Sequence, residues 1–68
     1  MNIYTSAYYM KQGYKIRRPN WAIGEFIFDI CGVIEKCFVE HDAQSSLGDW
    51  FPYTEDLLAT DWELFIEE

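Results

Sequence analysis

Large aromatic side chains are dense in this short sequence, and a single small core cannot hold them all. The chain has 68 residues, of which five are Phe, five are Tyr and three are Trp. A domain of this size buries only about 60% of the surface that its unfolded chain exposes. We therefore expect some of the aromatic rings to lie in a binding pocket or a subunit interface.

The composition indicates a single folded domain over residues 1–68. Half of the residues (50%) are hydrophobic, which is too many for a disordered acidic tail. No uninterrupted apolar run approaches the ~20 residues that a membrane-spanning helix needs, and the first residues lack the pattern of a secretory signal. We therefore expect a cytoplasmic domain that does not bind membranes.

Charge is divided unevenly along the chain. Residues 1–24 hold four of the five basic residues and no acid, whereas residues 25–68 hold all twelve acids and only Lys36. The net charge of -7 opposes the binding of long nucleic acid, whose affinity comes mostly from phosphate neutralisation. Two interpretations of the basic part stay open. Lys15, Arg17 and Arg18 hold phosphates of a small ligand, or the basic part meets the acidic part of another copy.

A short helix is expected near the N-terminus. Thr5 or Ser6 is the predicted N-cap, because a hydroxyl oxygen accepts a hydrogen bond from a free N–H group of the first turn. Ile3, Ala7 and Met10 follow helical spacing and are predicted to face the core. The helix has only about two turns, so packing rather than intrinsic propensity must stabilise it.

Alternating patterns predict an antiparallel meander after this helix. A strand over residues 14–18 is ended by Pro19, and a β-hairpin follows with strands over residues 26–30 and 34–40. Residues 32–33 are the expected two-residue turn of type II′, because glycine suits its first central position.

This turn fixes the expected register of the hairpin, in which Asp29 pairs with Lys36. The apolar residues expected on one face are Phe26, Phe28, Cys37 and Val39. The opposite face carries Ile27 and Phe38, which need a covering layer or another subunit.

The rest of the chain completes an α+β fold. Residues 41–49 are expected to form a loop, residues 50–51 a short strand, and residues 54–58 a single helical turn capped by Thr54. A strand over residues 61–66 follows. The predicted class is therefore α+β, with a short N-terminal helix, an antiparallel β-meander and one helical turn before the C-terminal strand.

Few residues offer a metal site or a catalytic step. Cys31, Cys37, His41 and Asp42 match no zinc spacing, and thiols of a cytoplasmic domain are more often small buried hydrophobes than a disulfide. His41 is the only histidine and is expected in an exposed loop. No serine lies in a nucleophile-elbow context. We therefore predict a protein that is not an enzyme and uses no metal or other cofactor.

The segment from Arg17 to Trp21 is the strongest candidate for a binding site. Guanidinium groups make paired hydrogen bonds with phosphate, an amide such as that of Asn20 recognises base or ribose edges, and an indole stacks on a nucleobase. Pro19 stiffens this segment, so less entropy is lost on binding. The alternative interpretation is structural: Trp21 fills the core, and the arginines pair with the acidic part of the chain.

Two blocks of the sequence resemble a known family. The first reads A-x-x-M-K-x-G-x-K-I-x-R-P-N-W over residues 7–21, and the second reads W-x-P-x-x-E-D-L-L-A-x-D-W-E over residues 50–63. They are similar to the phage Thoeris anti-defence sponge family, whose pattern combines K-V-x-R-x-x-W with a terminal W-x-P-S-x-x-D-L-L-A-x-D-W. The blocks stand in the family's order, and the terminal block is the more specific.

The resemblance implies a non-catalytic protein that sequesters a cyclic nucleotide immune signal. Members of this family form homotetramers with pockets at subunit interfaces. They bind glycocyclic ADP-ribose made by Thoeris immune sensors, and some also bind cyclic di- or trinucleotides. The positions that match the family pattern are Arg18, Trp21, Trp50, Asp56, Asp61 and Trp62.

Two features of the sequence depart from the family pattern. Tyr53 stands where the family usually has serine, so capping of the helical turn is expected to shift to Thr54 and the pocket rim to differ there. The middle of the chain, residues 31–49, is shorter than in typical members.

These observations lead to one hypothesis and two rivals. The predicted ligand-binding residues are Arg18, Asn20, Trp21, Trp50, Tyr53 and Asp56. A nucleobase stacks on Trp21 or Trp50 and Arg18 anchors a phosphate, inside an infected bacterial cell. The first rival is an acidic protein–protein inhibitor that imitates nucleic acid and blocks a defence effector such as a CRISPR nuclease. The second is an enzyme that hydrolyses the signal.

Overall fold

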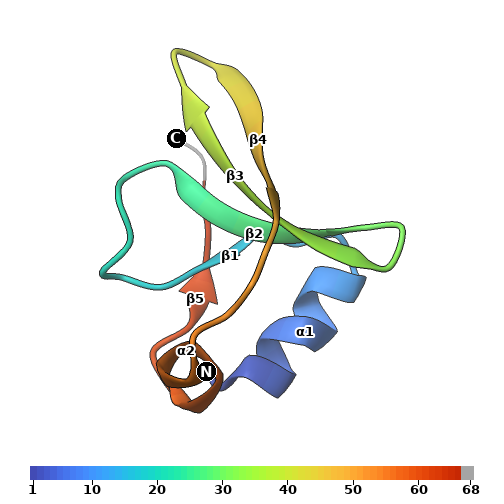
Figure 1. Ribbon diagram of the computed structural model, residues 1–68, viewed down its shortest axis with the longest axis vertical. Coiled ribbons are helices and arrows are strands. Elements are labelled where there is room, and N and C mark those ends of the chain that lie inside the picture. Colours follow the sequence, from blue (N-terminus) through green and yellow to red (C-terminus); the bar gives the residue numbers. More distant parts are fainter. Residues whose placement is uncertain (67–68) are drawn as a thin grey trace.

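A computed structural model describes residues 1–66, which form a five-stranded antiparallel sheet and two short helices (Figure 1). The elements in chain order are α1 (Ile3–Lys11), β1 (Ile16–Arg17), β2 (Glu25–Ile30), β3 (Val33–Glu40), β4 (Ala43–Asp49), α2 (Thr54–Leu58) and β5 (Glu63–Leu64). In space the strands follow the order β4-β3-β2-β1-β5. The predicted α+β class, with a helical turn before the last strand, is confirmed.

The main core lies between α1 and one face of the sheet (Figure 1). Met10, Ile16, Ile27 and Trp62 are buried together there, each with 2% or less of its surface exposed. This core covers Ile27 within a single chain, so no second subunit is required for that purpose. Burial of apolar surface in this layer is the main source of stability for so short a helix.

A smaller apolar cluster lies on the opposite face of the sheet. Phe26 and Cys37 are direct partners across β2 and β3, and both are almost fully buried. Phe65 packs on Phe26 with 4.7 Å between the ring centroids. The C-terminal segment therefore covers part of the face that α1 leaves open.

The first helix begins earlier than predicted. Asn2 is the N-cap, and its side-chain oxygen accepts a hydrogen bond of 2.9 Å from the Thr5 N–H. The predicted cap at Thr5 or Ser6 is therefore wrong. Ser6 is buried and donates its hydroxyl to the Asn2 carbonyl, whereas Ala7 is exposed. Among the described residues, no helix is long and apolar enough to cross a membrane.

The β2–β3 hairpin turns one residue earlier than predicted. Ile30 pairs with Val33, so the turn is Cys31-Gly32, with φ of +52° and +88°. Positive φ at both central residues is the mark of a type I′ turn rather than type II′. The register moves by two residues, so Lys36 pairs with Ile27 and not with Asp29. A shift of two keeps every side chain on its predicted face.

Residues 41–49 are mostly a strand and not the predicted loop. His41 and Asp42 form a second two-residue turn, both with positive φ, and β4 then pairs with β3. The predicted strand at residues 50–51 is wrong, because β4 ends at Asp49 and neither residue belongs to a strand. The last strand is likewise only Glu63–Leu64 and not the predicted 61–66.

Some aromatic rings lie outside both clusters, as the density of such residues predicts. Tyr4 on α1 is 84% exposed, Phe51 is 83% exposed and Tyr53 is 76% exposed. Phe51 and Tyr53 both lie in the segment between β4 and α2. This segment approaches the loop after β1, and the two together form the site described next.

Candidate functional site

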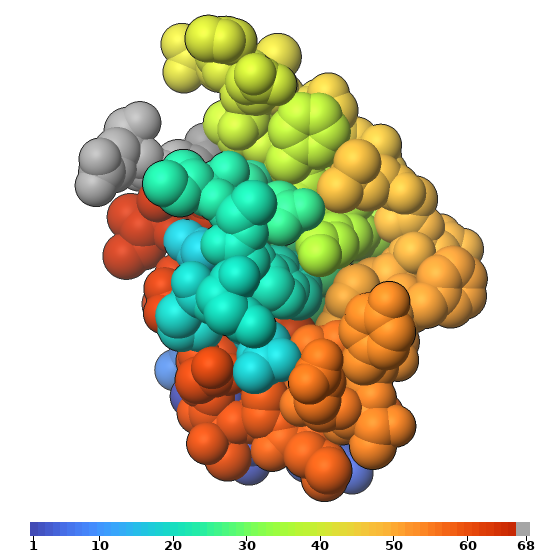
Figure 2. Space-filling view, turned by 60° about the vertical axis from the view of Figure 1, so that its left-hand side comes forward, coloured from blue at the N-terminus to red at the C-terminus, as the bar shows by residue number. Residues whose placement is uncertain are grey.

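A cavity of about 340 Å³ brings together all of the predicted ligand-binding residues. It lies where the loop after β1 meets the segment from β4 to α2. Figure 2 shows these two segments, cyan and orange, in contact. The predicted residues that line the cavity are Arg18, Asn20, Trp21, Trp50, Tyr53 and Asp56. Five further residues that sequence reasoning missed also line it: Lys36, Leu47, Asp49, Phe51 and Glu55.

Trp62 is a buried residue that contacts the rings of both Trp21 and Trp50, the two tryptophans predicted to stack on a ligand. Trp62 is only 2% exposed, and its indole N–H donates to the Asp56 carbonyl at 3.0 Å. Its ring is perpendicular to that of Trp21 at 5.4 Å and to that of Trp50 at 5.7 Å between centroids. Edge-to-face contacts of this kind are favourable beyond simple burial. Trp21 and Trp50 are therefore half-buried, and both pack against the ring of Trp62.

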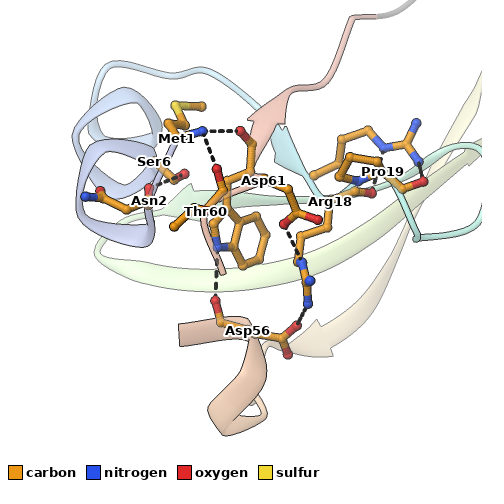
Figure 3. Close-up of polar contacts among 10 residues, drawn as sticks. Met1, Asn2, Ser6, Arg18, Pro19, Asp56, Thr60 and Asp61 are labelled. Carbon is orange, nitrogen blue, oxygen red and sulfur yellow. Dashed lines mark hydrogen bonds and ion pairs between the residues drawn. The ribbon is translucent and has the colours of Figure 1, made fainter. Parts of the chain in front are cut away.

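Arg18 lies between two carboxylates, as Figure 3 shows. Its Nη1 donates to Asp56 at 2.9 Å and its Nε donates to Asp61 at 3.0 Å. The Arg18 side chain is 14% exposed and that of Asp56 only 9%. This ion-pair network joins the first sequence block to the second, which is the structural role that the sequence left open for Arg18.

Hydrogen bonding between Arg18 and Asp61 also changes the pKa of both groups. Hydrogen bonds from Arg18 lower the pKa of Asp61, and bonds to Asp61 and then Asp56 raise the pKa of Arg18. Both shifts favour the charged forms of Arg18 and Asp61. One guanidinium with two carboxylates carries a net negative charge, so this group does not by itself attract an anion.

Asp56 also shapes the start of α2, but differently from the prediction. The N-cap is Tyr53, whose backbone N–H donates to Asp56 Oδ2 at 2.9 Å. The predicted cap at Thr54 is therefore wrong. Asp56 uses one carboxylate oxygen for this backbone bond and the other for Arg18. The absence of the family's usual serine at position 53 leaves this half of the capping arrangement intact.

Lys36 supplies a cation that the sequence did not identify. Its Nζ lies 4.0 Å from the centroid of the Trp21 ring, and 3.9 Å from a carboxylate oxygen of Glu25. The residue comes from the middle of β3, far from both sequence blocks. The expected register placed it opposite Asp29, whereas in the structure it pairs with Ile27.

Lys15 and Arg17, two further basic residues of the N-terminal part, face a different hollow. A wider depression of about 720 Å³ is lined by Lys15 and Arg17, together with residues near the ends of β3 and β5. The Arg17 guanidinium donates to the Trp21 carbonyl at 3.0 Å. The basic cluster predicted from the sequence is therefore divided, and only Arg18 belongs to the cavity that holds the tryptophans.

The cysteines and the histidine lie apart from this cavity. Cys37 is buried and burial raises the pKa of its thiol, whereas Cys31 is exposed, so the prediction of two buried thiols holds for Cys37 alone. His41 is exposed in the β3–β4 turn, as expected. Among residues 1–66, no group of three His, Cys, Asp or Glu side chains is placed to hold a metal ion.

Comparison with known proteins identifies one family. A family model described as the Thoeris anti-defense 2-like domain matches residues 1–65. No curated protein and no solved structure matches the chain. The match spans both sequence blocks and every residue that lines the tryptophan cavity.

Proposed function

The chain belongs to the Thoeris anti-defense 2-like family, and on that premise we propose that it sequesters a cyclic nucleotide immune signal without degrading it. The family assignment supports a phage anti-defence role. The ligand class proposed here is the one that the sequence resemblance implies, glycocyclic ADP-ribose or a cyclic oligonucleotide. The proposed setting is the cytoplasm of an infected bacterial cell.

The observation that carries the proposal is the convergence of both sequence blocks on one cavity. Trp21 comes from the first block and Trp50 from the second, and both are half-buried rings that line the cavity. The ammonium of Lys36 lies over the Trp21 ring. Stacking on an aromatic ring is worth roughly 1–3 kcal/mol per base. Asn20 is an exposed amide at the same cavity, where it is available to base or ribose edges.

The proposed mechanism is binding alone. The protein lowers the free concentration of the signal by mass action, so its effect depends on affinity and on the number of sites. Nanomolar affinity corresponds to about 12 kcal/mol, which one stacked base and one phosphate contact do not supply. Several contacts within an enclosed pocket are therefore part of the proposal.

A homo-oligomer, of the tetrameric kind that the resemblance implies, is the proposed route to that enclosure. Phe51 and Tyr53 are large exposed aromatic residues at the cavity rim. Burying such rings against a second copy is favourable at about 25 cal/mol per Å² of apolar surface. A second copy at this rim would also exclude water from the bound ligand.

The test is calorimetry of the Trp21→Ala variant with glycocyclic ADP-ribose. We expect at least about a tenfold loss of affinity, because a stacked base loses its aromatic partner. Tyr4→Ala is the matched control, since it removes an exposed aromatic ring on α1 outside the cavity and leaves affinity unchanged. Equal affinity of Trp21→Ala and the parent protein would contradict the assignment.

Binding measurements on the parent protein separate the rival hypothesis from sequestration. An acidic inhibitor of a defence effector binds no nucleotide from a panel of glycocyclic ADP-ribose and cyclic di- and trinucleotides. It binds a basic protein instead, with an affinity that falls steeply as salt is added. Either of these results would replace the sequestration proposal.

A further inference from the structure

We infer that Lys36, and not Arg18, is the side chain that receives a phosphate of the ligand, and that it leaves the face of Trp21 to do so. The inference rests on the proposed function, because it concerns the same cavity. It replaces the phosphate anchor that the sequence pattern suggested with a residue that lies outside both sequence blocks.

Arg18 is poorly suited to this task because its charge is already matched. Two carboxylates accept hydrogen bonds from Nη1 and Nε at 2.9 and 3.0 Å. An incoming phosphate would compete with Asp56, which also holds the backbone of Tyr53. Removing Arg18 from Asp56 would leave a largely buried carboxylate without its cation, and such an unpaired charge is strongly unfavourable.

Lys36 is held much more loosely. The Glu25 carboxylate lies 3.9 Å from its Nζ, near the outer limit for an ion pair, and the Lys36 side chain is 28% exposed. A lysine ammonium is a compact charge on a flexible stem with three donors. It can therefore turn toward a phosphate without breaking a short hydrogen bond.

The position of Lys36 links the binding of a nucleotide's base to the binding of its phosphate. Its ammonium now lies over the Trp21 ring at 4.0 Å, where it occupies the place of a stacked base on that face. A base that stacks there displaces the ammonium, and a phosphate on the same ligand gives the ammonium a stronger partner than the ring. A ligand that carries both groups is therefore favoured over one that carries either alone.

The test uses calorimetry of Lys36→Met with glycocyclic ADP-ribose at several salt concentrations. Methionine keeps an apolar stem beside Trp21 and removes the charge, and we expect affinity to fall about tenfold or more. The parent's affinity falls as salt is added, and that of Lys36→Met falls less, because one charge contact is gone. A role in packing alone would leave the salt dependence unchanged.

Lys11→Met is the matched control, because Lys11 is an exposed lysine on α1 that lines neither hollow. It keeps both the affinity and the salt dependence of the parent. If the parent binds the ligand and Lys36→Met binds it equally well, the inference about Lys36 is wrong and the proposed function stands. If the parent binds no member of the nucleotide panel, the proposed function fails and the inference fails with it.

Discussion

At the scale of single residues, the ion pairs of Arg18 connect parts of the chain that are about forty positions apart. Arg18 follows β1, whereas Asp56 lies in α2 and Asp61 just before β5. The same Asp56 accepts hydrogen bonds from the Tyr53 backbone and, through its carbonyl, from the Trp62 indole. These contacts fix the position of the buried ring against which Trp21 and Trp50 pack.

The Arg18–Asp61 pair makes stability depend on pH. The pKa of Asp61 is lower in the folded protein than in the unfolded chain, so between the two values the unfolded chain binds more protons. The stabilisation is therefore present above the unfolded value of about 4 and is lost as pH falls through the folded value. We expect Asp61→Asn to lower the Tm by a few degrees at pH 7, a difference that disappears in strong acid.

Thermal unfolding followed by circular dichroism between pH 7 and pH 2 measures this effect. The matched control is Asp42→Asn, which removes an exposed carboxylate in the β3–β4 turn without touching Arg18. Asparagine also tolerates the positive φ at that position. A pH profile of Asp61→Asn that runs parallel to the parent would show that the pair does not contribute.

At the scale of the elements, two tight turns and one close backbone approach determine the sheet. Both hairpin turns are two residues long with positive φ, which matches the twist of the flanking strands. At the start of β2, Gly24 approaches β3 closely: its carbonyl accepts a hydrogen bond from the Val39 N–H at 3.0 Å. A Cβ atom at Gly24 would lie 2.6 Å from the Val39 carbonyl oxygen.

Gly24→Ala is therefore expected to destabilise the protein more than Gly32→Ala. Both positions have positive φ, but a Cβ atom at Gly32 meets nothing within 4 Å. Gly32→Ala lowers the free energy of unfolding only through the strain of a positive φ, by about 1–2 kcal/mol. We expect the loss of stability in Gly24→Ala to exceed that in Gly32→Ala by about 1 kcal/mol or more, because the Val39 backbone must move to make room for the Cβ atom. Urea unfolding followed by tryptophan fluorescence measures both, and equal losses would contradict the close approach.

The strands show where a sequence pattern is sufficient and where it fails. The alternation in β2 and β3 placed Phe26 and Cys37 on one face and Ile27 on the other, as observed. The exact turn was missed because Cys31 is an unusual residue for a positive φ. β4 was missed because its sequence, AQSSLGD, has weak strand propensity, and it forms through pairing with β3.

At the scale of the whole molecule, the candidate site joins residues that the sequence identified separately. Chemistry and family pattern together were enough to select Trp21 and Trp50, which line one cavity. They were not enough to find Lys36, which lies in the middle of β3, outside both sequence blocks. They also left the role of Arg18 open, because a pairing with Asp56 and Asp61 depends on the folded chain.

The most direct test of the account asks whether the protein captures a cyclic nucleotide and returns it unchanged. The purified protein is mixed with glycocyclic ADP-ribose and with cyclic di- and trinucleotides, separated from unbound ligand and denatured by heat. Mass spectrometry then identifies what is released. We expect at least one member of the panel to be retained and released with its mass unaltered. Release of a cleaved product, or retention of no nucleotide at all, would contradict it.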